Sequence, residues 1–261
     1  MTTANSPVSR VGAGLVRGAA VLGFVLAMAA FLMLTAGPFG WRAGWWHYRV
    51  GLQTLMPYAG YVGVAGMAVS ALALIFGVRT IARRGIILAV LGLLIGGAVA
   101  YLPWHWNNMR GTYPRLNDVT TDLDNPPSLA FAEGMRKAEH GNPVAYGGAE
   151  PAAVQKKSYP DIAPAMLDMP PVQAFDRALA VAKAAGWSIV RADPAAGIIE
   201  ASDRSRWYGF TDDIAIRVAA AGTGSRVDIR SGARQGRGDF GVNATRVRGF
   251  LAALQAAAQS R

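Results

Sequence analysis

The sequence contains no cysteine, and this absence excludes several kinds of site. Among its 261 residues there is no thiol to form a disulfide, a thiolate metal site or a cysteine nucleophile. Histidine is almost as scarce, because His140 is the only one of three that lies beyond residue 105. We therefore predict no catalytic residues. A non-enzymatic protein is favoured over an enzyme. A hydrolase with a carboxylate site is the lesser alternative. Asp212 and Asp213 could do acid–base work, but adjacent residues on a strand point to opposite faces.

Acidic residues are absent from the first 117 positions. All 16 aspartates and glutamates lie at or beyond Asp118, whereas the first 102 residues carry seven arginines and no lysine. Seven of the ten excess positive charges thus flank apolar runs, where arginine determines membrane topology. The high net charge therefore does not indicate a basic soluble face, and we predict no nucleic-acid partner.

Three long runs without charge predict three transmembrane helices, since about 20 apolar residues cross a hydrocarbon core. We place the helices at about residues 17–37, 58–78 and 85–103, within a membrane anchor formed by residues 1–103. A cleaved signal peptide is the alternative for the first run, although its apolar body is longer than a usual signal core.

Arginines set the predicted orientation. The short loop between the second and third runs carries Arg79, Arg83 and Arg84, and positive residues in short loops stay cytoplasmic. The amino terminus is then cytoplasmic and the third helix ends outside. We expect a bacterial inner-membrane protein with its carboxyl-terminal domain in the periplasm.

Aromatic residues gather at the predicted outer ends of the helices, where rings favour the headgroup layer of the lipid bilayer. His47 and His105 lie among them, and imidazole is a common haem ligand. A haem or quinone site is the alternative to an aromatic belt. Neither histidine lies in the middle of a run, however, and we predict no cofactor.

The most distinctive stretch is NDVTTDLDNPP at residues 117–127. Its side chains favour a turn-rich extended segment, because Asp, Asn and Thr bond nearby backbone amides. We treat residues 104–158 as an aspartate-rich hinge and loose linker with a short helix near 129–138. The alternative is a calcium site, for which oxygen ligands are required. The candidate ligands are Asp118, Asp122 and Asp124, and the remaining motif residues are Asn117, Thr120, Thr121, Asn125, Pro126 and Pro127.

Several further motifs follow in order. They are YPDIAP, GWSIV, GIIEASDRS, GFTDDIAIRV and SRVDIRSGARQGRGDFGVNATRVRGFL. Together with the first motif, their order resembles that of the proteins grouped as domain of unknown function 1499, over about residues 115–255. The resemblance implies a shared fold and no assigned activity, so it brings no functional residues to this chain.

Residues 159–261 predict an α+β domain. A helix with apolar residues at helical spacing follows Pro171, and another covers residues 240–259. Four candidate strands lie between them, at residues 187–193, 197–202, 211–219 and 225–231. Their alternating residues favour an antiparallel sheet with one wet face. The predicted fold is therefore a three-helix transmembrane anchor followed by a two-layer domain with a four-stranded antiparallel sheet and two helices on one face.

Arginines in the soluble part suggest an anion site. Arginine binds phosphate or carboxylate through paired hydrogen bonds, and the loop SGARQGRGDFG leads into the start of the last helix, which favours negative charge. The alternative is an ion-paired polar sheet surface. The candidate ligand-binding residues are Arg204, Arg206, Arg230, Arg234 and Arg237.

These observations favour a membrane-anchored extracytoplasmic domain that binds a membrane or periplasmic protein or supports an envelope complex. A binding module for a small anionic or lipid ligand is the alternative. A cavity between the sheet and the helices would favour the second hypothesis. The sequence does not determine the oligomeric state.

Overall fold

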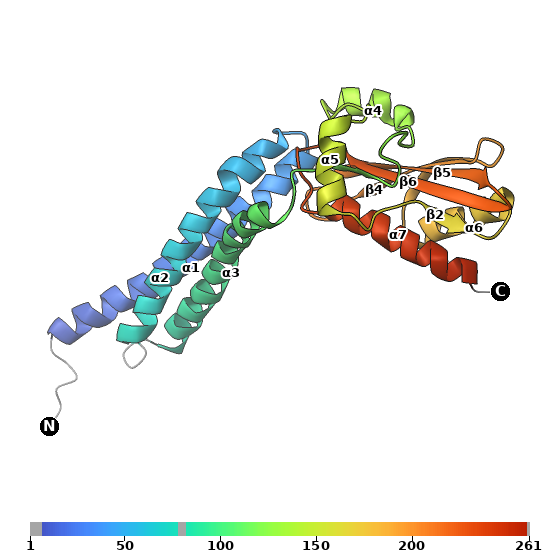
Figure 1. The fold of residues 1–261 in the computed structure, drawn as a ribbon. Coiled ribbons are helices and arrows are strands. Elements are labelled where there is room, and N and C mark those ends of the chain that lie inside the picture. Colours follow the sequence, from blue (N-terminus) through green and yellow to red (C-terminus); the bar gives the residue numbers. More distant parts are fainter. Residues whose placement is uncertain (1–6, 78–81, 260–261) are drawn as a thin grey trace. The chain divides into compact units, whose positions relative to one another are not determined.

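The computed structural model describes residues 7–77 and 82–259 (Figure 1). Its chain divides into two compact units, Met1–Met109 and Arg110–Arg261. The second unit begins well before residue 159, where the sequence prediction placed the start of the folded domain.

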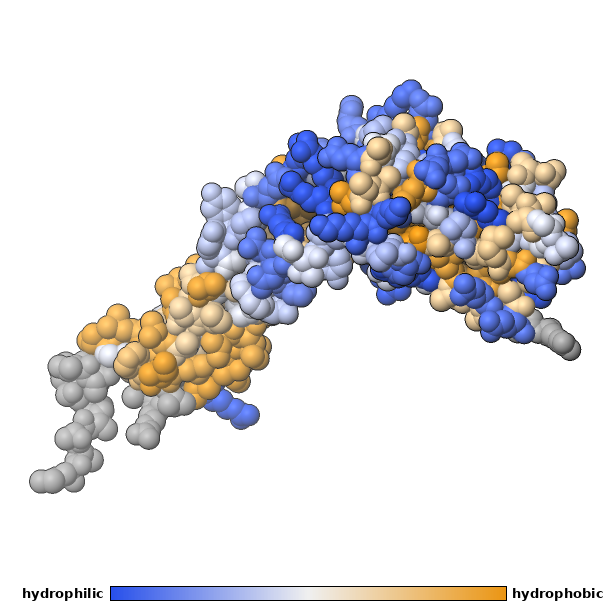
Figure 2. Space-filling model, viewed as in Figure 1, coloured by the Kyte–Doolittle hydropathy of each residue, from blue (hydrophilic) through white to orange (hydrophobic). Residues whose placement is uncertain are grey.

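The first unit contains three helices that are long and apolar enough to cross a membrane, and they span Val11–Arg42, Val50–Gly77 and Arg83–Thr112. Figure 2 shows an apolar surface over them. The elements are α1 (Pro7–Arg42), a π-helical turn η1 (Val50–Leu55), α2 (Met56–Gly77) and α3 (Arg83–Thr112). Arg79, on which part of the orientation prediction rests, lies outside the described residues.

Glycines bring the three helices of the first unit together. Ser70 of α2 is fully buried, and a Cβ atom added at Gly23 of α1 or Gly92 of α3 would lie 2.3 Å from its hydroxyl oxygen. A larger residue at either position would push the helices apart. Small residues thus allow the close approach that holds helices together in a membrane.

The second unit is built on an antiparallel sheet with the order β1-β6-β5-β4-β3, and β2 also pairs with β6. Its elements in chain order are β1 (Asp118–Thr120), η2 (Ala130–Ala132), α4 (Glu133–Ala138), α5 (Ala149–Ser158), β2 (Ala165–Leu167), α6 (Pro171–Ala184), β3 (Ser188–Asp193), β4 (Ile198–Arg204), β5 (Thr211–Ala221), β6 (Gly224–Ala233) and α7 (Val242–Gln259). The predicted antiparallel sheet with helices is observed.

The prediction of four strands was wrong, because the sheet has six. The four predicted strands correspond to β3–β6. The two missed strands have only three residues each, too few to show alternation, and β1 lies in an Asp-, Asn- and Thr-rich stretch that locally favours turns. Both strands form because they pair with the same edge of β6.

Helices α6 and α7 lie on one face of the sheet (Figure 1). Pro171 occupies the first turn of α6, where its fixed φ suits a helix start, and Gly186 follows the helix with φ +80°. Between helices and sheet, apolar side chains of both form one core. Its fully buried members include Ile199, Ile216, Ile229 and Val247.

Helix α4 lies over the opposite face of the sheet (Figure 1). The predicted linker, residues 104–158, therefore contains the end of α3, strand β1 and helices α4 and α5. Its glycines and polar residues give no helical or strand period, which is why the sequence suggested a loose segment. This segment is ordered by its contacts with the sheet, through the pairing of β1 with β6 and the hydrogen bonds of Arg136.

Candidate functional site

The face of the sheet beneath α4 carries a buried layer of ion pairs, which we call the arginine–aspartate layer. At its centre is Asp213 on β5, with a side chain that is 0% exposed. Arg136 of α4 donates to Asp213 Oδ2 from Nε at 2.7 Å, and Arg234 donates to Oδ1 from Nη2 at 2.7 Å. Arg136 also donates to the backbone oxygen of Gly232. These bonds attach α4 to the sheet.

Arg230 on β6 connects the layer to the 117–127 motif. Its Nη2 lies 2.7 Å from Asp118 Oδ2, and its guanidinium donates to the backbone oxygens of Pro127 and Val144. The ring of Tyr146 lies over this guanidinium at 5.4 Å. Burial raises the pKa of the Tyr146 phenol to about 12. Arg230 therefore holds the start of the motif, its end and the following loop together.

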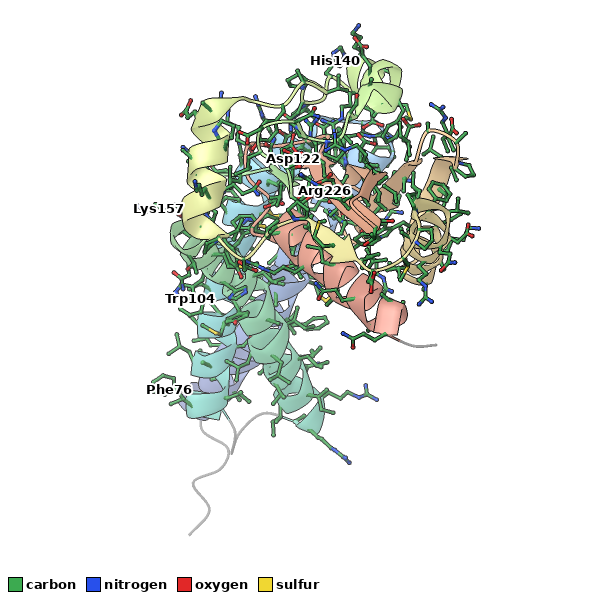
Figure 3. The ribbon with its side chains drawn as sticks, turned by 45° about the vertical axis from the view of Figure 1, so that its right-hand side comes forward. Phe76, Trp104, Asp122, His140, Lys157 and Arg226 are labelled. Atoms are coloured by element: carbon green, nitrogen blue, oxygen red, sulfur yellow. The ribbon has the colours of Figure 1, made fainter. Side chains whose placement is uncertain are left out.

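A second group in the layer surrounds Asp122. Its Oδ2 accepts from Arg217 at 2.9 Å and from Arg226 at 2.8 Å, and both arginines also contact Asp228. The side chains of Asp122 and Arg226 point toward each other in Figure 3. Burial opposes ionisation here, but the amide of Asn125 and the charge of Arg226 keep the pKa of Asp122 below its ordinary value.

The remaining motif residues make structural contacts. The side-chain amide of Asn117 donates to the Gly236 oxygen, and Thr121 Oγ1 accepts from the Ile229 amide. Gln155 of α5 donates to the Thr120 oxygen at 2.6 Å and accepts from the Thr120 amide at 3.0 Å. Nothing in the sequence marked Gln155, because a polar residue in a helix is ordinarily exposed.

The structure separates the five arginines of the predicted anion site. Arg230 and Arg234 are buried in the arginine–aspartate layer. Arg204 is exposed at the end of β4, and Arg206 and Arg237 are exposed on loops. The start of α7 is occupied by the chain's own carboxylate, since Asp239 accepts from the amides of Gly241 and Asn243. Anion binding at these residues stays a prediction.

The predicted calcium ligands are also spread out. Asp118 and Asp122 face arginines, while Asp124 is exposed. Within residues 7–77 and 82–259, no three His, Asp or Glu side chains are grouped as ligands for a metal ion. Arginine partners reduce the negative charge that a calcium ion requires.

A cleft between α6 and α7 offers space for a ligand. It has a volume of about 400 Å³, within the range of roughly 300–1,000 Å³ that small-molecule sites have. Small residues on facing helices leave the space, and the stacked rings of Trp187 and Phe250, 5.6 Å apart, form part of its wall. Its lining residues are Val181, Ala184, Ala185, Trp187, Arg246, Gly249, Phe250 and Ala253. We call it the α6–α7 cleft.

Arg246 forms the polar end of the α6–α7 cleft. Its Nη2 lies 2.8 Å from Asp212 and 2.8 Å from Asp203. Its Nη1 donates to Ser231 Oγ and Asn243 Oδ1. These partners hold the guanidinium in place, and burial raises the pKa of Asp212 to about 6 despite the neighbouring arginine.

The sequence did not predict the α6–α7 cleft. Its sequence signal is weak, because Gly249 and Ala253 occupy positions on the last helix where a larger apolar residue would fill the space. Alanine and glycine are so frequent in this chain that they do not mark a site. Only the packing of α6 against α7 shows that their small side chains face the same gap.

The comparisons with known proteins identify the family. The family described as Protein of unknown function (DUF1499) matches residues 118–254, more than half of the chain. No curated protein matches the chain. The matched region runs from β1 into α7 and includes both the arginine–aspartate layer and the α6–α7 cleft. The chain thus belongs to this family of proteins of unknown function, and three helices long and apolar enough to cross a membrane precede the shared domain.

Proposed function

We propose that this protein is a membrane-anchored binding protein of the bacterial envelope. In this proposal its second unit lies in the periplasm and takes the apolar part of an amphipathic ligand, such as a lipid acyl chain, in the α6–α7 cleft. The observation that carries the proposal is the cleft itself, an open and mainly apolar space between two helices of a domain that follows membrane helices.

The distribution of charge supports the orientation. Arg83 and Arg84 begin α3, and no acidic residue precedes Asp118. Positive residues next to a membrane helix favour the cytoplasmic side. An odd number of spans from a cytoplasmic amino terminus then leads the carboxyl-terminal unit to the outside.

The chemistry of the cleft favours an apolar group over an anion. Every nitrogen of the Arg246 guanidinium already contacts an oxygen of the protein, from Asp203, Asp212, Ser231 or Asn243. A ligand would therefore gain little from this charge. Burying apolar surface against Trp187 and Phe250 would contribute about 25 cal/mol for each Å² removed from water.

A photoreactive fatty acid tests the proposal. The full-length protein in detergent is irradiated with a fatty acid that carries a diazirine on its chain, and the modified residues are mapped by mass spectrometry. We expect modification on α6 and α7 around the cleft, with Trp187 and Phe250 among the modified residues. Labelling distributed only over α1–α3 would contradict the proposal.

Gly249→Leu is a variant designed to fill the cleft and so remove ligand binding. A Cβ atom at Gly249 meets no atom within 4 Å, so the new side chain fits the backbone and occupies the cleft, and leucine favours a helix more than glycine does. Labelling in the cleft should fall while the fold is retained. Gly134→Leu on α4, where an added Cβ also meets nothing within 4 Å, is the matched control and should label as the wild type does.

A second candidate function, binding of a partner protein, is favoured by strand β3. This strand ends the order of the sheet and pairs with β4, and its Val190 is 51% exposed. An open strand edge is a surface on which another chain can add a strand. A co-purifying protein that Val190→Lys releases, and that Gly249→Leu leaves bound, would support this function over ligand binding.

A further inference from the structure

The last turn of α6 borders the α6–α7 cleft with backbone acceptors. Ala184 and Ala185 are among the lining residues, and α6 ends at Ala184. The amides of Gly186 and Trp187 turn back to the two carbonyl groups that precede Ala184 and occupy them. Within residues 7–77 and 82–259, no donor reaches the backbone oxygen of Ala184 or Ala185. These two oxygens are therefore available to a ligand.

The end of α6 also gives the cleft a negative potential. The carboxyl end of a helix carries a partial negative charge, because its last carbonyl groups have no partner within the helix. Lys183 lies in the same turn, but it is not among the residues that line the cleft. A positively charged group is therefore favoured at this part of the cleft.

Asp203 adds a full negative charge beside the polar end of the cleft. It contacts Arg246 through Oδ2 alone, and in the part of the chain that the structure describes its Oδ1 accepts no hydrogen bond. The side chain of Asp203 is 38% exposed. Arg246 also contacts Asp212 at 2.8 Å, so that two carboxylates share one guanidinium. This pairing leaves negative charge in excess beside the cleft.

The volume of the cleft fits one apolar chain. A protein cavity of about 150 Å³ holds a benzene molecule, and the cleft measures about 400 Å³. The same density gives room for roughly sixteen carbon atoms. That number corresponds to one long alkyl chain, whereas a membrane phospholipid carries two. The apolar wall formed by Val181, Trp187 and Phe250 suits such a chain.

We propose that the α6–α7 cleft binds a single-chain amphiphile with a positively charged head, an alkylammonium. Its chain lies against Trp187 and Phe250, and its ammonium group faces Asp203 and the end of α6. This inference rests on the proposed ligand-binding function of the cleft and names the class of ligand. An ammonium group brings three N–H donors and no acceptor, which matches the free oxygens at the cleft. A carboxylate or phosphate would bring only further acceptors and a charge of the same sign.

Competition between amphiphiles of one chain length tests this inference. The full-length protein in a neutral detergent is irradiated at about pH 7.5 with a dodecanol that carries a diazirine, and labelled peptides of α6 and α7 are quantified by mass spectrometry. Unlabelled dodecylamine, dodecanol and dodecanoate serve as competitors, since at this pH the amine is protonated and the acid is ionised. We expect dodecylamine to displace the label at about one tenth of the concentration that dodecanoate requires, the effect of one charged hydrogen bond.

The outcomes separate the inference from the proposed function. Equal displacement by the three competitors, or strongest displacement by dodecanoate, would overturn the preference for a cation and leave the cleft as a site for apolar chains. If the probe labelled neither α6 nor α7, the proposed function itself would be contradicted, and the inference with it. Gly249→Leu should remove the label, which shows that the competition takes place in the cleft.

Asp203→Asn locates the source of the preference, because it removes the charge and nearly keeps the shape. The advantage of dodecylamine over dodecanoate should fall about fivefold, the effect of one partly exposed charge. Asp161→Asn is the matched control. Asp161 also contacts an arginine of α7, Arg248, at 2.6 Å, but neither residue lines the cleft, so this variant should keep the wild-type ratio. An unchanged ratio in Asp203→Asn would refute the contact between Asp203 and the ammonium group.

Discussion

Two neighbouring aspartates on β5 show how differently the two faces of this sheet are built. Asp212 points toward α7 and contacts Arg246 at the polar end of the α6–α7 cleft. Asp213 points to the other face, where Arg136 and Arg234 enclose it. One face is an apolar core with a charged rim, and the other is a layer of ion pairs that is itself covered.

The comparison shows that charged residues on alternate strand positions need not face water. Alternation in β5 and β6 predicts an apolar face and a polar face exposed to water, but the polar face is buried. Alternation does not reveal that α4 and the segment before it cover the charged one. The covering segment offers arginine and backbone oxygens, so each buried charge has a partner of opposite sign or a hydrogen bond.

Removing Asp213 should have the largest effect, because the comparison predicts that the charged face depends on complete pairing. Asp213→Ala leaves the buried guanidiniums of Arg136 and Arg234 without their shared carboxylate. We expect a loss of about 3–5 kcal/mol in the free energy of unfolding of the second unit. Hydrogen exchange of β5 and β6 amides in the full-length protein measures it. A loss below about 1 kcal/mol would show that water reaches this face.

The next largest effect should come from the pH dependence of Asp212. Burial raises its pKa in the folded state to about 6 from an ordinary value of 3.8. The folded protein therefore holds this proton more tightly than the unfolded chain does. The resulting stability is complete below about pH 4 and is lost as the pH rises through 6, by up to about 3 kcal/mol.

Asp212→Asn isolates this contribution, because all other titrating groups, including Asp203 and Asp239, remain. Between pH 4 and pH 6.5, the wild type should lose stability relative to the variant when both are followed by hydrogen exchange. A constant difference between the two proteins over this range would show that Asp212 stays ionised in the folded state.

A smaller effect is expected from shortening one side chain in the apolar core. Ile216 lies fully buried between the sheet and the helices, and Ile216→Val should cost about 0.5–1.5 kcal/mol. The same exchange measurement applies. If this variant were as destabilised as Asp213→Ala, the apolar face would be as sensitive to single changes as the charged one, and the contrast between the faces would fail.

The smallest effect should come from an ion pair outside both faces. Arg191 contacts Asp193 at 2.6 Å on the exposed strand β3, and Asp193→Ala should change stability by less than about 1 kcal/mol. Thermal unfolding in detergent at two salt concentrations measures the stability lost in Asp193→Ala and in Asp213→Ala. Similar losses for the two variants would mean that burial does not distinguish the two ion pairs.

The sequence predicted the regular parts of the fold well, because they carry a period that the chain shows locally. The charge-free runs gave three apolar helices, and alternation around Ile214 and Ile216 gave the central strands. Strands β1 and β2 were missed since three residues carry no period, and α5 was missed since its buried Gln155 resembles a surface residue.

The candidate site was harder to predict from the sequence than the fold. Arg230 and Arg234 resemble anion ligands when seen alone, yet Asp118 and Asp213, distant from them in the chain, occupy their hydrogen-bonding groups. The sequence did not indicate that Arg246 and Gly249 line a cleft, because a cleft between helices is formed by what two surfaces leave unfilled.

Composition and periodicity by themselves determined the three apolar helices and the antiparallel sheet, since each depends on residues close together in the chain. The order of several sequence motifs indicated the family. The tertiary structure alone decided that the supposed linker covers the sheet, that two of the arginines serve as internal partners and that a cleft opens between α6 and α7. The physical reason is that charge pairing and packing depend on distances between segments that are remote in the sequence.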